Sequence, residues 1–283
     1  MSDDSLGKKN LLENSWLNSL SIPILIVFLG AAIIFGVTKI LSTDRGYKDL
    51  VRELNSKSFG NKWVSAYELS KVINSSSIKK EDIPWIVDNL KDVYMGSTDP
   101  RTKQFIIVAL GALKSPRSMV VYNDVLKYRE INADVLIQTL ISISKLEKLE
   151  ENIVTNLEKY FNRSEPLVKQ TLYFITSKFK ISKFINHLEL ALEEKNVFIR
   201  YSAATSLIIF KNKKSLNILK EVLVMRRDKK RLNIDEKQRK LLIYNVLIGL
   251  RNANWNVLEK ELKDLSEVEL DLELKNEARK NLK

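Results

Sequence analysis

The stretch that decides the fold is NVFIRYSAATSLIIF, residues 196–210. Asn196 is a favoured helix-capping residue, and the apolar residues after it recur at the spacing of a helix face. Five further stretches share this pattern and also open with Asp, Asn or Glu: residues 61–73, 99–113, 132–146, 165–179 and 236–250. Their aligned central leucines are Leu69, Leu110, Leu140, Leu172, Leu207 and Leu247, separated by 41, 30, 32, 35 and 40 residues. The chain therefore repeats one helical unit.

Between these stretches the sequence predicts a second, more amphipathic set of helices at residues 81–94, 117–128, 149–161, 182–194 and 215–225. A helix at 47–56 precedes the set, and helices at 255–265 and 267–282 close the chain. Because one helix pair cannot bury its apolar face alone, neighbouring pairs must stack. Glycine (8) and proline (5) are too scarce for an all-β fold with many tight turns. We expect an all-α fold, an α-solenoid of about six repeats, with four aromatic residues in its core: Trp63, Trp85, Tyr173 and Phe174.

Three of the stretches carry a resemblance to a known family. Residues 196–207 resemble the inner helix of a HEAT repeat, with Arg200 after the first hydrophobes and then Ala203-Ala204 and Leu207. Residues 99–113 look like a second copy, with Lys103 in place of the arginine, whereas the copies at 132–146, 165–179 and 236–250 keep only the apolar spacing. Residues 61–73 are similar to the first Trp-x-x-Ala-x-Glu-Leu repeat of bacterial membrane-anchored HEAT proteins. The resemblance covers residues 47–250 and implies a scaffold or adaptor that binds other proteins.

A long apolar run precedes the repeats. Residues 19–41 read SLSIPILIVFLGAAIIFGVTKIL, and no charged residue lies between Glu13 and Lys39. As a helix these 23 residues span about 34 Å, enough to cross a hydrocarbon core of about 30 Å. The sequence predicts a polar tail (1–15), a transmembrane helix (16–41), a juxtamembrane linker and helix (42–60) and the repeat domain (61–283). The alternatives are a cleavable signal peptide, which would be shorter and end in a small-x-small site, and a buried core helix.

Flanking charge gives the orientation of this helix. Lys8 and Lys9 precede it, whereas five cations follow it at Lys39, Arg45, Lys48, Arg52 and Lys57. The positive-inside rule places the repeats in the cytoplasm, although a long domain can be translocated regardless of charge. Within the helix, Ala32 and Gly36 are small residues four apart, a spacing that allows close packing on a partner's transmembrane helix. Alternatively, they reflect only the abundance of small residues in membrane helices.

Few residues are suited to catalysis. The chain has no cysteine and one histidine, His187, with no evident base or ligand partner. We expect His187 to be structural and the adjacent Glu81 and Asp82 to start a helix. The sequence predicts no enzyme activity, no cofactor, no metal and no small-molecule substrate. An enzyme built on a helical-repeat fold would need an acidic pocket with a perturbed group, and the sequence defines none.

A basic cluster remains. The net charge is +12, and cations concentrate in residues 211–240, centred on Arg226, Arg227, Lys229, Lys230 and Arg231. One interpretation is a contact for anionic lipid or an acidic partner segment, and another is a contact for nucleic-acid phosphates. No aromatic residues interleave the cluster, which argues against single-stranded nucleic acid. The third interpretation is a solvated loop between helices. Together these observations predict a single-pass membrane scaffold or adaptor, or alternatively a lipid- or nucleic-acid-binding module.

Overall fold

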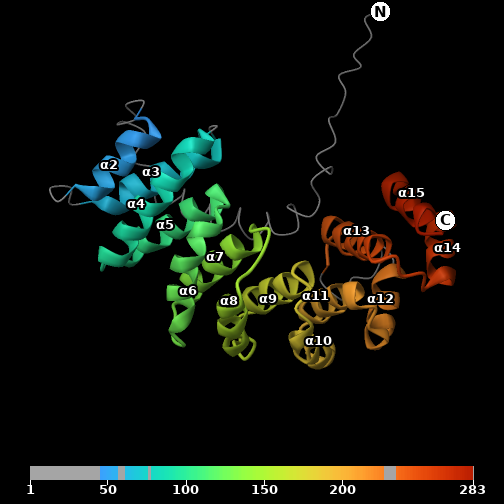
Figure 1. The fold of residues 1–283 in the computed structure, drawn as a ribbon. Helices are drawn as coiled ribbons and strands as arrows, with labels where there is room; N and C mark the ends of the chain where they lie inside the picture. Colours follow the sequence, from blue (N-terminus) through green and yellow to red (C-terminus); the bar gives the residue numbers. More distant parts are fainter. Residues whose placement is uncertain (1–44, 57–60, 76–77, 226–233, 283) are drawn as a thin grey trace, which may run out of the picture.

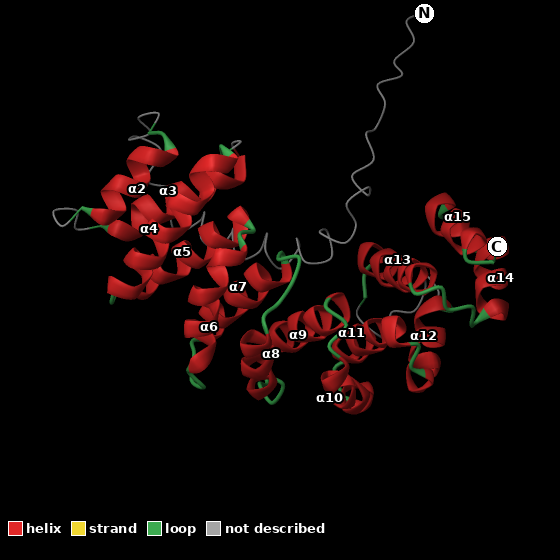
Figure 2. Ribbon diagram, in the orientation of Figure 1, coloured by secondary structure: helices red, strands yellow, loops and turns green. Residues whose placement is uncertain are grey.

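Helix is the only regular secondary structure in the described part of the chain. The computed structural model describes residues 45–56, 61–75, 78–225 and 234–282, and within these ranges no strand occurs (Figure 2). The all-α prediction is confirmed. Residues 1–44 lie outside the described ranges, and with them the predicted transmembrane helix and its Ala32 and Gly36. In the part that is described, no helix combines the length and apolar character needed to cross a bilayer.

The helices form two rows. One row holds α3 (Lys62–Ser75), α5 (Pro100–Leu113), α7 (Ala133–Ser144), α9 (Pro166–Lys178), α11 (Val197–Leu207), α13 (Glu236–Asn252) and α15 (Leu272–Lys280). The other holds α2 (Tyr47–Asn55), α4 (Ile83–Gly96), α6 (Met119–Lys127), α8 (Glu151–Leu157), α10 (Ile185–Leu190), α12 (Leu216–Leu223) and α14 (Glu259–Val268).

Successive helices of the first row, from α3 to α13, pack side by side. Members of the second row contact the first row and, in places, one another. Figure 1 shows the result as an arc running from α2 to α15, with α9, α11 and α13 on its inner side and α10 and α12 on its outer side. We call the two rows inner and outer helices. Each pair touches only its neighbours, as expected of a repeat-like array.

Three of the six predicted capping residues, Asp99, Asn132 and Asn196, cap their inner helices, whereas Glu165 forms no side-chain cap and the cap of α13 is Asp235 instead of Glu236. The Asp99, Asn132 and Asn196 side chains accept hydrogen bonds from backbone N–H groups in the first turns of α5, α7 and α11. Asp235 forms a capping box with Gln238 at the start of α13, and Asp271 caps α15. These side chains satisfy amides that have no partner within the helix.

The six aligned leucines form the spine of the core. All six, from Leu69 in α3 to Leu247 in α13, are at most 1% exposed. The repeat spacing read from the sequence therefore marks the true inner helices. Among the four aromatic residues, Tyr173 is buried as expected, and Trp63 and Phe174 are half-buried. The prediction for Trp85 is wrong: it is 38% exposed, because α4 turns Ile86, Val87 and Leu90 inward and leaves Trp85 on its opposite face.

The helix ends differ from the prediction in several places, among them the helix expected at 149–161, where α8 covers Glu151–Leu157 and a 3-10 turn follows at Glu158–Tyr160. The helix expected at 182–194 is a short α10 with a 3-10 turn on each side, at Ser182–Phe184 and Ala191–Glu193. The closing helices begin later than predicted: α14 starts after Leu258, which has the left-handed φ of 60°, and α15 starts after the cap at Asp271.

Candidate functional site

A groove crosses three inner helices near their C-terminal ends. It has a volume of about 460 Å³ and is lined by Lys71, Asn74 and Ser75 of α3, Val108 of α5, Gln138, Ile141 and Ser142 of α7, and Lys145 just after α7. Val108 and Ile141 supply apolar surface, and Lys71 and Lys145 supply positive charge. We call this feature the inner groove.

Lys145 lines the inner groove, and Lys178 lies beside it, bonded to carbonyls at the end of α7. Burial, and then the charge of Lys114, lower the pKa of the Lys145 ammonium. The same two causes, in the same order, lower the pKa of Lys178, whose ammonium donates to the carbonyl oxygens of Ser144 and Leu146 at 2.5 and 2.8 Å. Carbonyls at a helix C-terminus carry partial negative charge and favour such cations. The arrangement suits a segment that presents an apolar side chain next to a carboxylate.

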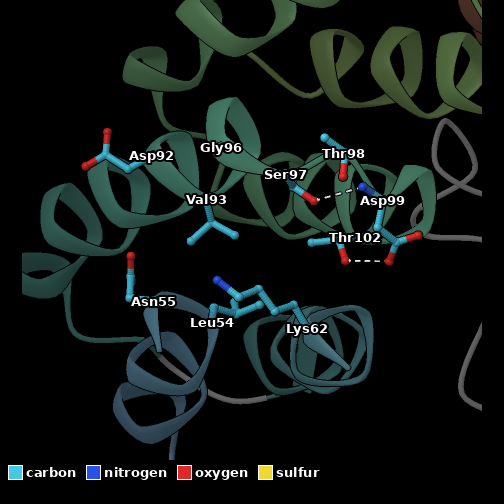
Figure 3. A pocket seen from close by; sticks show the side chains of 10 residues that line it. All are labelled: Leu54, Asn55, Lys62, Asp92, Val93, Gly96, Ser97, Thr98, Asp99 and Thr102. Atoms are coloured by element: carbon cyan, nitrogen blue, oxygen red, sulfur yellow. Dashed lines mark hydrogen bonds between the residues drawn. The ribbon is translucent and has the colours of Figure 1, made fainter. Parts of the chain in front are cut away.

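A second pocket lies at the start of the array, between α2, α3, α4 and α5 (Figure 3). Its volume is about 410 Å³, and its lining includes Lys62, Asp92 and Asp99. The Asp99 carboxylate accepts from the Arg101 amide at 3.2 Å and from the Thr102 hydroxyl at 2.8 Å, and the Asp99 amide donates to the Ser97 hydroxyl. Asp99 is therefore committed to capping α5.

His187 packs as an aromatic residue. Its ring stacks on Phe161, with centroids 4.4 Å apart and an angle of 18° between the planes, and meets the edge of Phe184 at 6.1 Å. These contacts agree with the structural role expected from the sequence. Within the described ranges, no three His, Cys, Asp or Glu side chains come close enough together to hold a metal ion.

The basic cluster lies outside the described residues. Arg226, Arg227, Lys229, Lys230 and Arg231 fall between Met225, which follows α12, and Ile234, which precedes α13. The prediction for this cluster therefore stays a prediction, as does the one for Ala32 and Gly36.

The sequence did not single out the inner groove. Val108 and Ile141 belong to apolar helices whose residues are assigned to the core by default, and only the packing shows that they border open space. Lys71 and Lys145 could have indicated the groove in the sequence, because each is a cation near the C-terminal end of an otherwise apolar inner stretch.

Comparison with known proteins gives a similarity of fold and no match to a known family. No protein-family model and no curated protein matches the sequence. Among solved structures, the crystal structure of YibA from Escherichia coli aligns with a TM-score of 0.54 at 15% identity, over 83% of this chain and 81% of YibA. An engineered protein aligns with a TM-score of 0.43 at 14% identity, over 83% of this chain and 94% of its own. The likeness to YibA supports an all-helical, repeat-like fold and extends no further than the fold.

Proposed function

We propose that the chain is a HEAT-like scaffold or adaptor that a single transmembrane helix within residues 16–41 holds at a membrane. In this proposal the repeats lie on the cytoplasmic side and bind a partner protein, and the chain acts by binding rather than by catalysis. Ala32 and Gly36 would pack against a transmembrane helix of that partner complex. The apolar run, the flanking charges and the repeat-like fold support the proposal.

The inner groove is the observation that carries the binding role. Three successive inner helices supply its lining, so one partner segment can touch several repeats at once. Its lining combines the apolar Val108 and Ile141 with the cationic Lys71 and Lys145. A partner helix or strand with an apolar anchor and a nearby carboxylate matches this surface, because anchors in well-packed pockets supply most of the affinity at interfaces.

Crosslinking in native membranes followed by mass spectrometry tests the proposal. The wild-type full-length chain should crosslink to one defined membrane partner. Val108→Arg, which places a cation in the groove lining, should abolish the crosslink and leave the helical circular dichroism unchanged. Val120→Arg is the matched control, because Val120 is 53% exposed on the outer helix α6. If both variants crosslink to the partner equally, the inner groove is not the binding site. If the chain does not sediment with membranes on fractionation, residues 16–41 do not anchor it.

A second candidate function rests on the basic cluster. Five of the six residues from Arg226 to Arg231 are cations, which favours contact with anionic lipid or, as the weaker alternative, nucleic acid. Charge reversal at these five residues should remove binding of the chain to anionic vesicles. Unchanged binding would eliminate this candidate.

A further inference from the structure

One edge of the array concentrates positive charge. The connections from α5 to α6 (114–118), from α9 to α10 (179–184) and from α11 to α12 (211–215), together with Lys178 at the end of α9, hold eight cations and no acidic residue. The cations are Lys114, Arg117, Lys178, Lys180, Lys183, Lys211, Lys213 and Lys214. We call these three connections the lysine edge. Two further connections of this edge are balanced: residues 78–82, from α3 to α4, and residues 145–150, from α7 to α8, each hold two lysines and two acidic residues.

The three connections share an edge because the inner helices pack side by side and the late residues of one meet the late residues of the next, as Gly111 of α5 meets Ser142 of α7. The bonds from Lys178 to the carbonyls of Ser144 and Leu146 show that the C-terminal ends of α7 and α9 meet there. The opposite edge has another character. Its described connections include residues 97–99, 128–132, 161–165, 194–196, 224–225, 234–235 and 269–271, which hold seven acidic residues and three cations. In the sequence, the connection from α12 to α13 also contains the five cations of the basic cluster, which lie outside the described residues. The two edges therefore differ in the sign of their charge over the described residues.

Three lysines of this edge occupy backbone positions that favour glycine or asparagine. Lys114, Lys180 and Lys211 have φ values of 51°, 51° and 50°. Lys180 and Lys211 stand at the C′ position of Schellman motifs, closed by the bonds from Ile181 to Thr176 and from Asn212 to Leu207. The equivalent residue after α13 is Asn254, a residue that tolerates this conformation.

Lysine at such a position costs backbone stability that glycine would not. The helix C-terminus attracts a cation and offsets part of that cost. Lys114, Lys180 and Lys211 are exposed, and within the described chain none of them forms an ion pair. Their ammonium groups are therefore available to an external anion.

The chain also enters the array at this edge. At the start of α2, the Tyr47 hydroxyl donates to Asp82 at 2.6 Å and the Lys48 ammonium lies 3.1 Å from the same carboxylate. Asp82 lies in the connection from α3 to α4, which belongs to the same edge as the three lysine-rich connections. The predicted anchor ends at Leu41, six residues before Tyr47, and six residues reach at most about 20 Å. A membrane crossed by the anchor would therefore lie next to the lysine edge.

We propose that the lysine edge docks on the anionic phospholipid headgroups of the leaflet from which the anchor emerges. This inference rests on the proposed anchor and adds to it an orientation: the array stands with one edge on the membrane, and its inner groove lies near the same helix ends. A planar lipid surface can meet cations spread along a row of repeats. Phe179 and Phe184 of this edge are half-buried or buried, so they offer no platform for nucleic-acid bases.

Site-specific fluorescence on the full-length chain tests the docking. The protein has no cysteine, so single labels can be placed cleanly. Ser182→Cys labels the lysine edge, and Ser164→Cys is the matched control on the opposite edge; both serines are exposed. Each labelled protein is reconstituted into nanodiscs that carry a headgroup quencher, with or without phosphatidylglycerol. We expect phosphatidylglycerol to increase quenching of the label at 182 and to leave the label at 164 unchanged.

The triple variant Lys114→Gly, Lys180→Gly, Lys211→Gly separates docking from folding. Each surface lysine contributes roughly a fivefold preference for an anionic leaflet, so losing three should weaken docking about 100-fold and remove the lipid-dependent quenching. Its thermal stability should stay equal or rise, since glycine relieves the left-handed positions. Asn at the same three positions is a second variant with the same expectation.

Four outcomes would overturn the proposal. The first two are equal quenching of the labels at 182 and 164, and unchanged quenching in both triple variants. The third is a loss of quenching only when the charges of Arg226–Arg231 are reversed. The fourth is that the chain binds duplex DNA but not lipid, and that the triple variants abolish this DNA binding. Failure of the chain to insert into nanodiscs at all would instead refute the anchor, and is seen before any quenching is measured.

Discussion

Replacing Gly111 by alanine should loosen the contact between α5 and α7. A Cβ atom at residue 111 would lie 2.3 Å from the Ser142 Oγ, 2.7 Å from its Cβ and 3.1 Å from its Cα. The Oγ can rotate away, at the loss of its 3.1 Å hydrogen bond to the Ile107 carbonyl, but the Cβ and Cα move only with the α7 backbone.

Two opposing terms set the size of this effect. Alanine gains about 1 kcal/mol of helix propensity over glycine, whereas forcing atoms into a packed interface typically costs about 1–3 kcal/mol and more where backbone must shift. Because two of the three contacts involve atoms fixed to the α7 backbone, we expect the upper part of that range. The net loss in the free energy of unfolding should be about 2 kcal/mol, measured by urea titration of the full chain followed by circular dichroism.

Second substitutions make the reasoning refutable. Ser142→Ala keeps the Cβ at 2.7 Å and should not rescue Gly111→Ala, whereas Ser142→Gly removes it and should recover much of the loss. Gly96→Ala is the control, since nothing lies within 4 Å of its added Cβ, and it should be neutral or gain up to about 1 kcal/mol. If Gly111→Ala proves as stable as Gly96→Ala, the close approach of α5 and α7 is not what residue 111 provides.

Three further substitutions probe the caps and the C-terminal pairs. Asn196→Ala removes the acceptor for two amides of α11 and should cost about 1 kcal/mol in urea titration; no change would mean that solvent caps the helix equally well. Arg239→Ala should cost about 3–5 kcal/mol, because it leaves the buried Glu269 without the guanidinium 3.0 Å away; a loss below 1 kcal/mol would contradict that pairing. Burial alone would raise the pKa of Asp271, but Lys240 and two backbone amides hold it below the ordinary value. Its contribution to stability is therefore present above about pH 4 and is lost as the pH falls through the folded-state pKa. In the Asp271→Asn variant, the free energy of unfolding should fall less steeply as the pH drops below about 4. The same steepness as in the wild type would refute this.

Local sequence signals predicted the inner helices well. Their apolar spacing and their caps act within a few residues, and the burial of all six aligned leucines, Leu69 to Leu247, follows from that spacing. The outer helices were predicted less accurately. The 3-10 turns around α10 and the exposure of Trp85 depend on how each outer helix packs against the inner helices. That packing involves residues far apart in the sequence, so a local pattern cannot predict it.

The candidate surfaces needed the assembled array. The inner groove joins residues from three repeats, and Val108 looks like core until the helices are packed. Lys114, Lys180 and Lys211 are about one or two repeats apart in sequence, and only the shared direction of the inner helices puts them on one edge. The basic cluster at 226–231 drew attention in the sequence because its charges are contiguous, whereas the charges of the lysine edge are dispersed.

Packing between neighbours alone has a mechanical consequence. No contact ties α2 to α15 across the arc, so the curvature is the sum of small rotations at successive interfaces. A small rotation at each interface between neighbouring repeats changes the distance between the two ends of the arc and breaks no core contact. Fixed to a surface at one end, such an element can store strain when a bound partner pulls on the other, and can return it when the partner leaves.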